Sequence, residues 1–303
     1  MKRICDSNKD RARWLAERNN GIGASDIAAL IGLSKWDSPL SLYAQKIGAT
    51  PAETVEPEWL EWGNRLEGVI LEAYGERSGR RVARSGELFA HDDVPWARAT
   101  FDAFTLLKAD TWIPLQAKNA GEYKAEEWAE GVPAWYDAQL QWEMFVAGKD
   151  TPAGSVACLL GGRRMIWDDT ERNSALIHQM HTAGEAFWYC VENRIPPAPD
   201  ASEHSRTALH LLYPREVPES IVSLPASLME QADLLAAVKE TEKGLEADRL
   251  MAENTIKAAM GTATVGVLPD GRRFQWKVQQ RKEYMVKASE ARVFRALKSK
   301  EER

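Results

Sequence analysis

Asp102 and the segment Gln116-Ala117-Lys118 have the residue types and spacing that could do hydrolytic chemistry. Residues i and i+2 of a strand point to the same face, so Gln116 and Lys118 are expected to project together, with Asp102 on a neighbouring strand. Glu67 supplies a further carboxylate from a helical segment upstream. Hard oxygen ligands of this kind hold Mg²⁺ or Mn²⁺, and such an ion polarises a phosphate and activates a bound water. Because a lysine can orient that water, the group is suited to phosphodiester hydrolysis.

Plainer interpretations compete with this one. A surface strand with a solvated Lys118 fits the same spacing, and an isolated Glu67 is more often a solvated helix carboxylate. His178 and His181 lie three apart on an expected helix, but the sequence near them offers no third metal ligand. Gly161-Gly162 is not followed by the Gly-Lys-Ser/Thr of a phosphate loop, so it is best explained as a turn between strands.

Periodicity predicts the elements that must position these residues. Short helices are expected over residues 8–48, where residues 21–26 form a turn and Ser25 or Asp26 caps the apolar run 27–31. Longer helices are expected over 57–78, 123–130, 133–147 and 170–193. Strands are expected over 81–84, 88–91, 97–107, 112–118, 155–160 and 165–168. The predicted fold class is therefore α+β, with a small, mixed, mostly antiparallel sheet flanked by helices.

The composition shifts after the proline-rich residues 196–199. We expect a core domain over 1–200, a linker over 201–224, and a helical appendage with a short β-hairpin over 225–303. The last 23 residues carry eight Lys and Arg against four Glu, so they could touch DNA or a partner protein.

The overall composition fits a cytoplasmic protein. The chain has 303 residues, a net charge of −6 and three cysteines without metal-type spacing. No apolar run of about 18 residues or more predicts a membrane span, and the N-terminus lacks the apolar region of a secretory signal. The negative charge argues against a protein that coats DNA by bulk attraction, although a local basic channel remains compatible with it.

Several segments, taken in order, resemble the YqaJ-type viral recombinase family. This family is related to phage lambda exonuclease and has the PD-(D/E)xK, restriction-endonuclease-like core. The resemblance covers roughly residues 14–200, and residues 18–34 are its most specific part. Further matching residues are Trp36, Pro39, Leu40, Leu42, Gly63 with Glu67, Ala99-Thr100-Phe101-Asp102, Leu115-Gln116-Ala117-Lys118, Pro133, Tyr136, Gln139, Gln141, Phe187-Trp188 and Pro196-Pro197.

The resemblance implies a role for each of these polar residues at a metal site. Asp102 is implied as the central metal ligand, the position of Gln116 as a second and the main-chain carbonyl of Ala117 as a third. Glu67 is implied to hold metal or its water, and Lys118 to activate the nucleophile. The implied cofactor is Mg²⁺, with Mn²⁺ as an alternative and two ions per site.

The resemblance also implies contacts with DNA. Gln139 is expected beside the scissile phosphate, with Gln141 as a further candidate on the same helix. Arg18 and Ser25 match positions that grip the 5′-terminal phosphate, which fits the affinity of a guanidinium and a helix N-terminus for anions. For Ser25, a plain N-cap is the competing interpretation.

The implied function is a 5′→3′ exonuclease on linear double-stranded DNA that leaves 3′ single-stranded tails. The implied partners are duplex DNA ends, a single-strand annealing protein and further copies of the chain in a ring, for example a trimer.

The departure from the family pattern is Gln116, where Glu or Asp is expected. Three explanations stay open for it: a natural variant that still cuts, a chain that binds DNA ends without cutting, and a Glu changed to Gln to trap a complex. An adaptor that acts through residues 225–303 is a further alternative.

Overall fold

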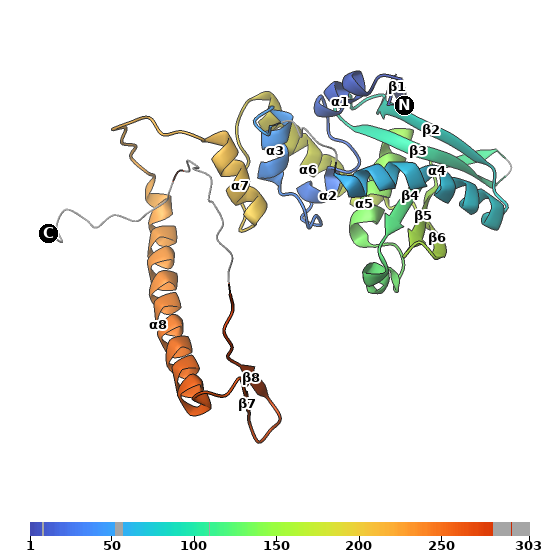
Figure 1. The fold of residues 1–303 in the computed structure, drawn as a ribbon. Helices are drawn as coiled ribbons and strands as arrows, with labels where there is room; N and C mark the ends of the chain where they lie inside the picture. Colours follow the sequence, from blue (N-terminus) through green and yellow to red (C-terminus); the bar gives the residue numbers. More distant parts are fainter. Residues whose placement is uncertain (8, 52–56, 109, 281–291, 293–303) are drawn as a thin grey trace. The chain divides into compact units, whose positions relative to one another are not determined.

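One six-stranded sheet organises residues 1–214, and its strands lie side by side in chain order (Figure 1). The strands are β1 Lys2–Asp6, β2 Val82–Ala90, β3 Arg98–Lys108, β4 Thr111–Ala120, β5 Ala153–Leu160 and β6 Arg164–Glu171. The computed structural model describes residues 1–7, 9–51, 57–108, 110–280 and 292. Neighbouring strands are antiparallel except β4 and β5, which are parallel. A parallel pair needs a crossover connection, and the segment that contains α5 supplies it.

Helices cover both faces of the sheet. Leu115 and Ala157 pack with Tyr74 of α4, whereas Val156 packs with Leu140 of α5. Because successive strand residues point to opposite faces, α4 and α5 lie on opposite sides of the sheet. The helices are α1 Arg11–Asn19, α2 Ile27–Leu30, α3 Pro39–Lys46, α4 Glu58–Ser78, the 3₁₀ helix η1 Glu122–Trp128, α5 Ala134–Ala147, α6 Ser174–Glu192 and α7 Glu203–Leu212. This arrangement confirms the predicted α+β class with a mostly antiparallel sheet.

Local sequence signals explain where several helices begin and end. The Ser38 side chain accepts a hydrogen bond from the Ser41 backbone and Pro39 follows as the first helical residue, so α3 starts on a capping box. Helix α4 ends at Gly79, whose φ of 69° lies in the left-handed region that glycine adopts without strain.

The strands and helices depart from expectation in four places. Strand β1 was not predicted, because it is a short edge strand with two exposed charged residues, Lys2 and Arg3, and only one buried residue, Cys5. The two strands expected over 81–84 and 88–91 are one strand, β2, with an irregularity between Arg84 and Glu87. The helix expected over 123–130 is 3₁₀, and α6 begins at Ser174 because β6 continues to Glu171.

The expected cap of α2 is wrong. Asp26 stands at the N-cap position but makes no side-chain hydrogen bond to the helix. Its Oδ2 atom instead accepts hydrogen bonds from the Gly23 backbone at 2.8 Å and from Lys46 Nζ at 2.7 Å. Since α2 has four residues, its dipole contributes little to an anion site, and that part of the sequence argument does not hold.

Helix α7 occupies part of the segment that we expected to be a linker. Its Ala208 is buried, and Ser205 Oγ donates a hydrogen bond to Ser38 Oγ of α3 at 3.0 Å. The first compact unit therefore extends to Pro214, whereas the sequence placed the boundary at residue 200. Helix α7 was not predicted, although its two buried residues, Ser205 and Ala208, lie three positions apart on one face.

The second unit, Arg215–Arg303, contains a long helix and a short hairpin. It comprises η2 Ala226–Leu228, α8 Met229–Met260, β7 Val265–Val267 and β8 Arg273–Gln275. The expected helix and hairpin are both present, and the described residues of α8 include no buried one. The basic segment 281–303 lies outside the described residues except for Arg292. In the described ranges, no helix has the length and apolar character needed to cross a membrane.

Candidate active site

Asp102 lies where β3 and β4 separate. The pairing of these strands ends at Ala103 opposite Leu115, and the later residues of β4 pair with β5. The backbone N–H of Ala117 donates to Asp102 Oδ2 at 2.9 Å. Burial raises the pKa of Asp102 above its ordinary value, while the nearby Lys118 charge and this hydrogen bond oppose the rise. The strand separation thus fixes a carboxylate beside the β4 backbone.

Lys118 reaches from β4 to α5, where an amide holds it. Lys118 Nζ donates to Gln139 Oε1 at 3.1 Å and lies 4.9 Å from the centre of the Tyr136 ring. Gln139 Nε2 donates in turn to Glu143 Oε1 at 3.3 Å. An ammonium group has three donors, so Lys118 keeps donor capacity for a phosphate oxygen or a water.

Gln116 also reaches α5, as expected for a residue two positions from Lys118. Its side chain is fully buried, and its Nε2 donates to Glu143 Oε1 at 3.0 Å. Its Oε1 atom is buried and has no hydrogen-bond partner in the described part of the chain. Glu143 is 2% exposed, and burial, followed by the charge of Asp102, raises its pKa.

Glu67 approaches the same group from α4. Burial and then the charge of Asp102 raise its pKa to about 7, while Arg84 and Lys118 oppose the rise. A side chain at Gly68 would meet the Arg84 guanidinium at 2.7 Å, so glycine there allows the arginine to lie against the helix. Glu67 and Asp102 are therefore close enough for their charges to interact.

One cleft of about 940 Å³ connects most of the residues predicted from the sequence. Its lining includes both predicted groups of residues: Arg18 and Ser25, and Glu67, Asp102, Lys118 and Gln139. Gln116 faces α5 from within the core, beside this lining. Arg11 and Arg84 add two further guanidinium groups, so the cleft carries cations around its carboxylates.

Gln141 has a structural position instead. It is 1% exposed, and its Nε2 donates to the Glu171 carbonyl at 2.8 Å while its Oε1 accepts from the Asn173 backbone at 2.8 Å. These bonds tie α5 to the connection between β6 and α6. His181 stacks on Trp96 at 5.6 Å between ring centres, which fits the interpretation of an ordinary packed histidine.

Arg18 and Ser25, which also line the cleft, contact each other. Arg18 Nη2 donates to Ser25 Oγ at 2.9 Å, and the Arg18 guanidinium lies 4.9 Å from the centre of the Trp14 ring. Trp14 Nε1 donates to Thr100 Oγ1 at 2.9 Å, which fixes α1 over β3. Ser25 is exposed, so an anion can reach its hydroxyl and the guanidinium together.

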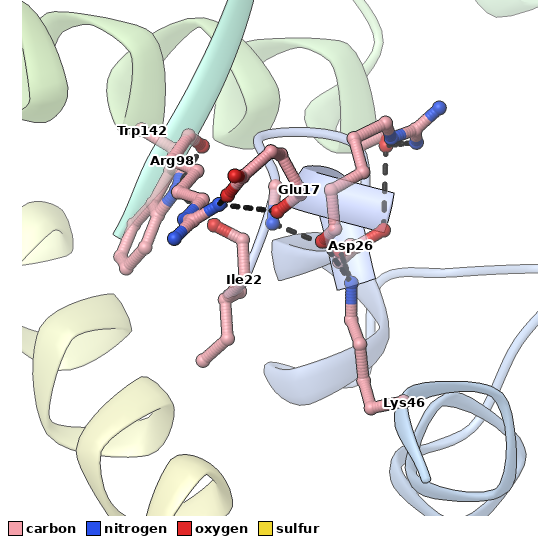
Figure 2. Close-up of polar contacts among 9 residues, drawn as sticks. Glu17, Ile22, Asp26, Lys46, Arg98 and Trp142 are labelled. Carbon is pink, nitrogen blue, oxygen red and sulfur yellow. Dashed lines mark hydrogen bonds and ion pairs between the residues drawn. The ribbon is translucent and has the colours of Figure 1, made fainter. Parts of the chain in front are cut away.

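A buried ion pair between Lys46 and Asp26 contacts both Arg18 and Ser25. Figure 2 shows Lys46 of α3 directed at Asp26, and the two side chains are only 2% and 9% exposed. Lys46 Nζ also donates to the main-chain carbonyl of Arg18 at 3.1 Å. Burial alone would raise the pKa of Asp26, but the charges of Lys46 and Arg18 hold it below its ordinary value.

A second set of hydrogen bonds attaches residues 17–22 to β3 and α5 (Figure 2). Arg98 Nη1 donates to Glu17 Oε2 at 2.8 Å and also to the Glu17 carbonyl. Trp142 Nε1 is shared between the carbonyls of Ile22 and Arg98, at 3.3 and 3.2 Å. A side chain at Gly21 would meet the Trp96 carbonyl at 2.5 Å, so only glycine permits this close approach.

The ligand atoms around Asp102 fit a divalent cation of the Mg²⁺ or Mn²⁺ class. Asp102 and Glu67 supply carboxylate oxygens, and Gln116 supplies a buried amide oxygen that has no hydrogen-bond partner among the described residues. No group of three His, Cys, Asp or Glu side chains in the described ranges is arranged to hold a metal alone. A metal here would therefore depend on amide or main-chain oxygens as well, such as the Ala117 carbonyl implied by the family resemblance.

Glu143 is the residue of this group that the sequence analysis missed. A detectable signal existed, because Glu143 lies four residues after Gln139 on a predicted helix, and such residues share a face. A charged residue between Trp142 and Met144 also interrupts the apolar run with which this helix ends, on the expected core face.

The chain is similar to a known family and to a curated relative. Residues 13–150 match the YqaJ-like viral recombinase domain. The uncharacterized protein YqaJ of Bacillus subtilis (strain 168) is 29% identical over 265 residues, which covers 87% of this chain and 82% of that protein. The resemblance inferred from sequence motifs is thus confirmed.

Two solved structures are also similar in part. An alkaline exonuclease from Laribacter hongkongensis is 20% identical, with a TM-score of 0.48, and the similarity covers 66% of this chain and 98% of that one. A phage-related exonuclease from Haemophilus somnus 129PT is 16% identical, with a TM-score of 0.43, over 58% of this chain and 95% of that one.

Proposed function

Because residues 13–150 match the YqaJ-like viral recombinase domain, we propose that this protein is a metal-dependent nuclease that degrades duplex DNA from its ends. The observation that carries the proposal is the single cleft in which carboxylates and a lysine lie with an arginine and a serine that suit a terminal phosphate. A solvated surface strand, the plainer interpretation, would not bury Asp102 or tie Lys118 to a second element.

The reaction is hydrolysis of a phosphodiester bond. Water attacks the phosphorus, the bond to the 3′ oxygen breaks, and the next nucleotide keeps a 5′ phosphate. A bound divalent ion supplies polarisation of the phosphate and a lower pKa for the water. Lys118 Nζ, positioned by Gln139, donates to the attacking water or to a phosphate oxygen whose negative charge grows. Asp102 and Glu67 present the negative oxygens that the ion requires.

Recognition of the DNA end is assigned to Arg18 and Ser25. A guanidinium and a hydroxyl that already contact each other can both donate to one phosphate, and charge-assisted bonds of this kind are about twice as strong as neutral ones. Because Trp14 and Lys46 fix the position of Arg18, the grip needs little reorganisation on binding.

Several finer features belong to the proposal. A grip on the 5′ phosphate in the same cleft as the cleavage residues gives 5′→3′ digestion and a 3′ single-stranded tail. That tail is the substrate of a single-strand annealing protein, the expected partner. Mg²⁺ is the expected ion, with Mn²⁺ as a substitute and two ions per site, and the chain is expected to form a ring around DNA.

The proposal is tested by release of acid-soluble nucleotide from linear duplex DNA with Mg²⁺ present. Lys118→Met should abolish release and leave DNA binding largely intact, because this change keeps the aliphatic stem and removes the charge. Asn119→Ala, in the neighbouring exposed position of β4, is the matched control and should keep wild-type activity. Equal activity of the two variants would contradict the assignment of Lys118.

A DNA-end-binding protein without nuclease activity is the second candidate, and Gln116 is the observation that favours it. A neutral amide at this position provides one less negative charge for the metal. Retention of 5′-phosphorylated duplex ends with no nucleotide release, in Mg²⁺ and in Mn²⁺, would support this candidate over the nuclease.

A further inference from the structure

We propose that Glu143 supplies the carboxylate that position 116 lacks, so that Asp102, Glu143 and the amide oxygen of Gln116 form one cation site. This inference rests on the proposed function and names a ligand of the same site. The second carboxylate would then come from α5, which faces β4, and not from β4 itself.

The first observation is that Glu143 is a buried carboxylate held by neutral groups. Its side chain is 2% exposed, and the amides of Gln116 and Gln139 both donate to its Oε1 atom, at 3.0 and 3.3 Å. Amide donors satisfy hydrogen bonding but do not cancel a charge. A buried ion that is not paired loses its hydration without an equal gain from the protein. Glu143 therefore needs a cation close by when it is ionised.

The second observation is the Oε1 atom of Gln116. This oxygen is buried, and no donor in the described residues reaches it. An acceptor left in this state has lost its hydrogen bond to water without a replacement, and such atoms are rare in folded proteins. Because the amide nitrogen of the same side chain is bonded to Glu143, the unpaired oxygen lies beside the carboxylate group.

A single divalent cation resolves both features. It would neutralise Glu143 and would accept the lone pair of Gln116 Oε1, since carboxylate and amide oxygens are both ligands of Mg²⁺ and Mn²⁺. The Lys118 charge offsets part of the charge on Glu143, but Lys118 Nζ donates to Gln139, and no donor in the described residues reaches Gln116 Oε1. Asp102 accepts a hydrogen bond from the backbone N–H of Ala117, the residue next to Gln116, so the second carboxylate lies beside the same stretch of β4.

The contact between positions 116 and 143 also explains the amide on β4. Two carboxylates at 3.0 Å would repel each other in the metal-free protein, whereas an amide beside a carboxylate forms a hydrogen bond. An exchange of the two groups should therefore preserve the site. The variant Gln116→Glu/Glu143→Gln keeps one charge and one amide in the same contact.

The test is calorimetric titration of the full-length protein with Mn²⁺ in the absence of DNA, which measures metal affinity independently of activity. Glu143→Gln should weaken binding at least about tenfold, the size of loss typical when the surroundings of a metal are altered. The exchange variant should bind within about threefold of wild type, because charge and amide are both retained. Asp137→Asn removes a half-buried carboxylate elsewhere on α5 and should leave the affinity unchanged.

Asp102→Asn separates failure of this inference from failure of the proposed function. If Asp102→Asn loses Mn²⁺ binding and Glu143→Gln keeps it, Glu143 is not a ligand and its contacts are structural, while the proposed metal site survives. If both variants bind as wild type does, or wild type binds no Mn²⁺, the proposed function fails with the inference. If Glu143→Gln does not fold, the exchange variant decides, since loss of Mn²⁺ binding in the folded exchange variant would overturn the inference.

Discussion

Lys46→Met should destabilise the first unit strongly and disturb the recognition of DNA ends. The substitution keeps the approximate length of the side chain and leaves the Asp26 carboxylate buried, with hydrogen bonds from the Gly23 N–H at 2.8 Å and the Ser25 hydroxyl at 3.4 Å. Breaking a buried ion pair from one side costs about 3–5 kcal/mol. For a unit of this size, each kcal/mol lowers Tm by about 2–4 °C, so the expected loss is roughly 6–20 °C.

Differential scanning calorimetry at neutral pH measures this loss, and Lys243→Met is the matched control. Lys243 and Glu240 form a pair in which both side chains are about 80% exposed, so its removal should leave Tm unchanged. A Tm shift below about 2 °C for Lys46→Met would refute the reasoning, because the cost of a buried unpaired carboxylate would then be absent. Because the pKa of Asp26 is lowered in the folded protein, its ionised carboxylate stabilises the fold above the ordinary carboxyl pKa. This stabilisation is lost as the pH falls through the folded-state pKa.

Three further predictions concern other parts of the cleft. Arg18→Ala should slow digestion of 5′-phosphorylated duplex more than that of 5′-hydroxyl duplex, and equal slowing in a gel-based time course would make Arg18 structural. Mn²⁺ affinity in calorimetry should fall as the pH drops from about 8 to about 6, because burial raises the pKa of Glu67 to about 7 and that of Glu143 to about 8, so protons on both compete with the ion. Glu67→Gln should make this dependence shallower, and an unchanged slope would contradict the role of Glu67. Trp142→Phe should lower stability in urea by about 1–3 kcal/mol, because the carbonyls of Ile22 and Arg98 lose a shared buried donor; stability equal to that of wild type would show that water replaces the donor.

The main elements of the site were predictable because their periodicity is strong. The period of two in β3 and β4 placed Lys118 and Gln116 on one face, and both side chains reach α5 in the structure. Helices α4 and α5 matched the predicted ranges within one or two residues, since each has apolar residues that repeat with the helical period. The α+β class follows from this alternation of periods.

The missed features depend on contacts between distant residues. Asp26 carries the sequence signature of an N-cap, but its carboxylate bonds to Lys46, twenty positions away in the chain. Glu143 becomes part of the site only because β4 lies against α5, so its role follows from tertiary packing and not from local pattern. Helix α7 is attached to the start of α3 by the hydrogen bond from Ser205 to Ser38, which joins residues 167 positions apart in the chain.

The measurement that tests the central claim most directly is a paired assay of Asp102→Asn on 5′-phosphorylated linear duplex DNA. We predict that nucleotide release with Mg²⁺ falls to background, while the dissociation constant for the same DNA, measured in Ca²⁺, stays within about threefold of wild type, because hydrolysis needs the ligand charge and DNA contacts come from other residues. Nucleotide release at the wild-type rate would contradict the account, because the cleft around Asp102 would then not be the place where the bond is cut.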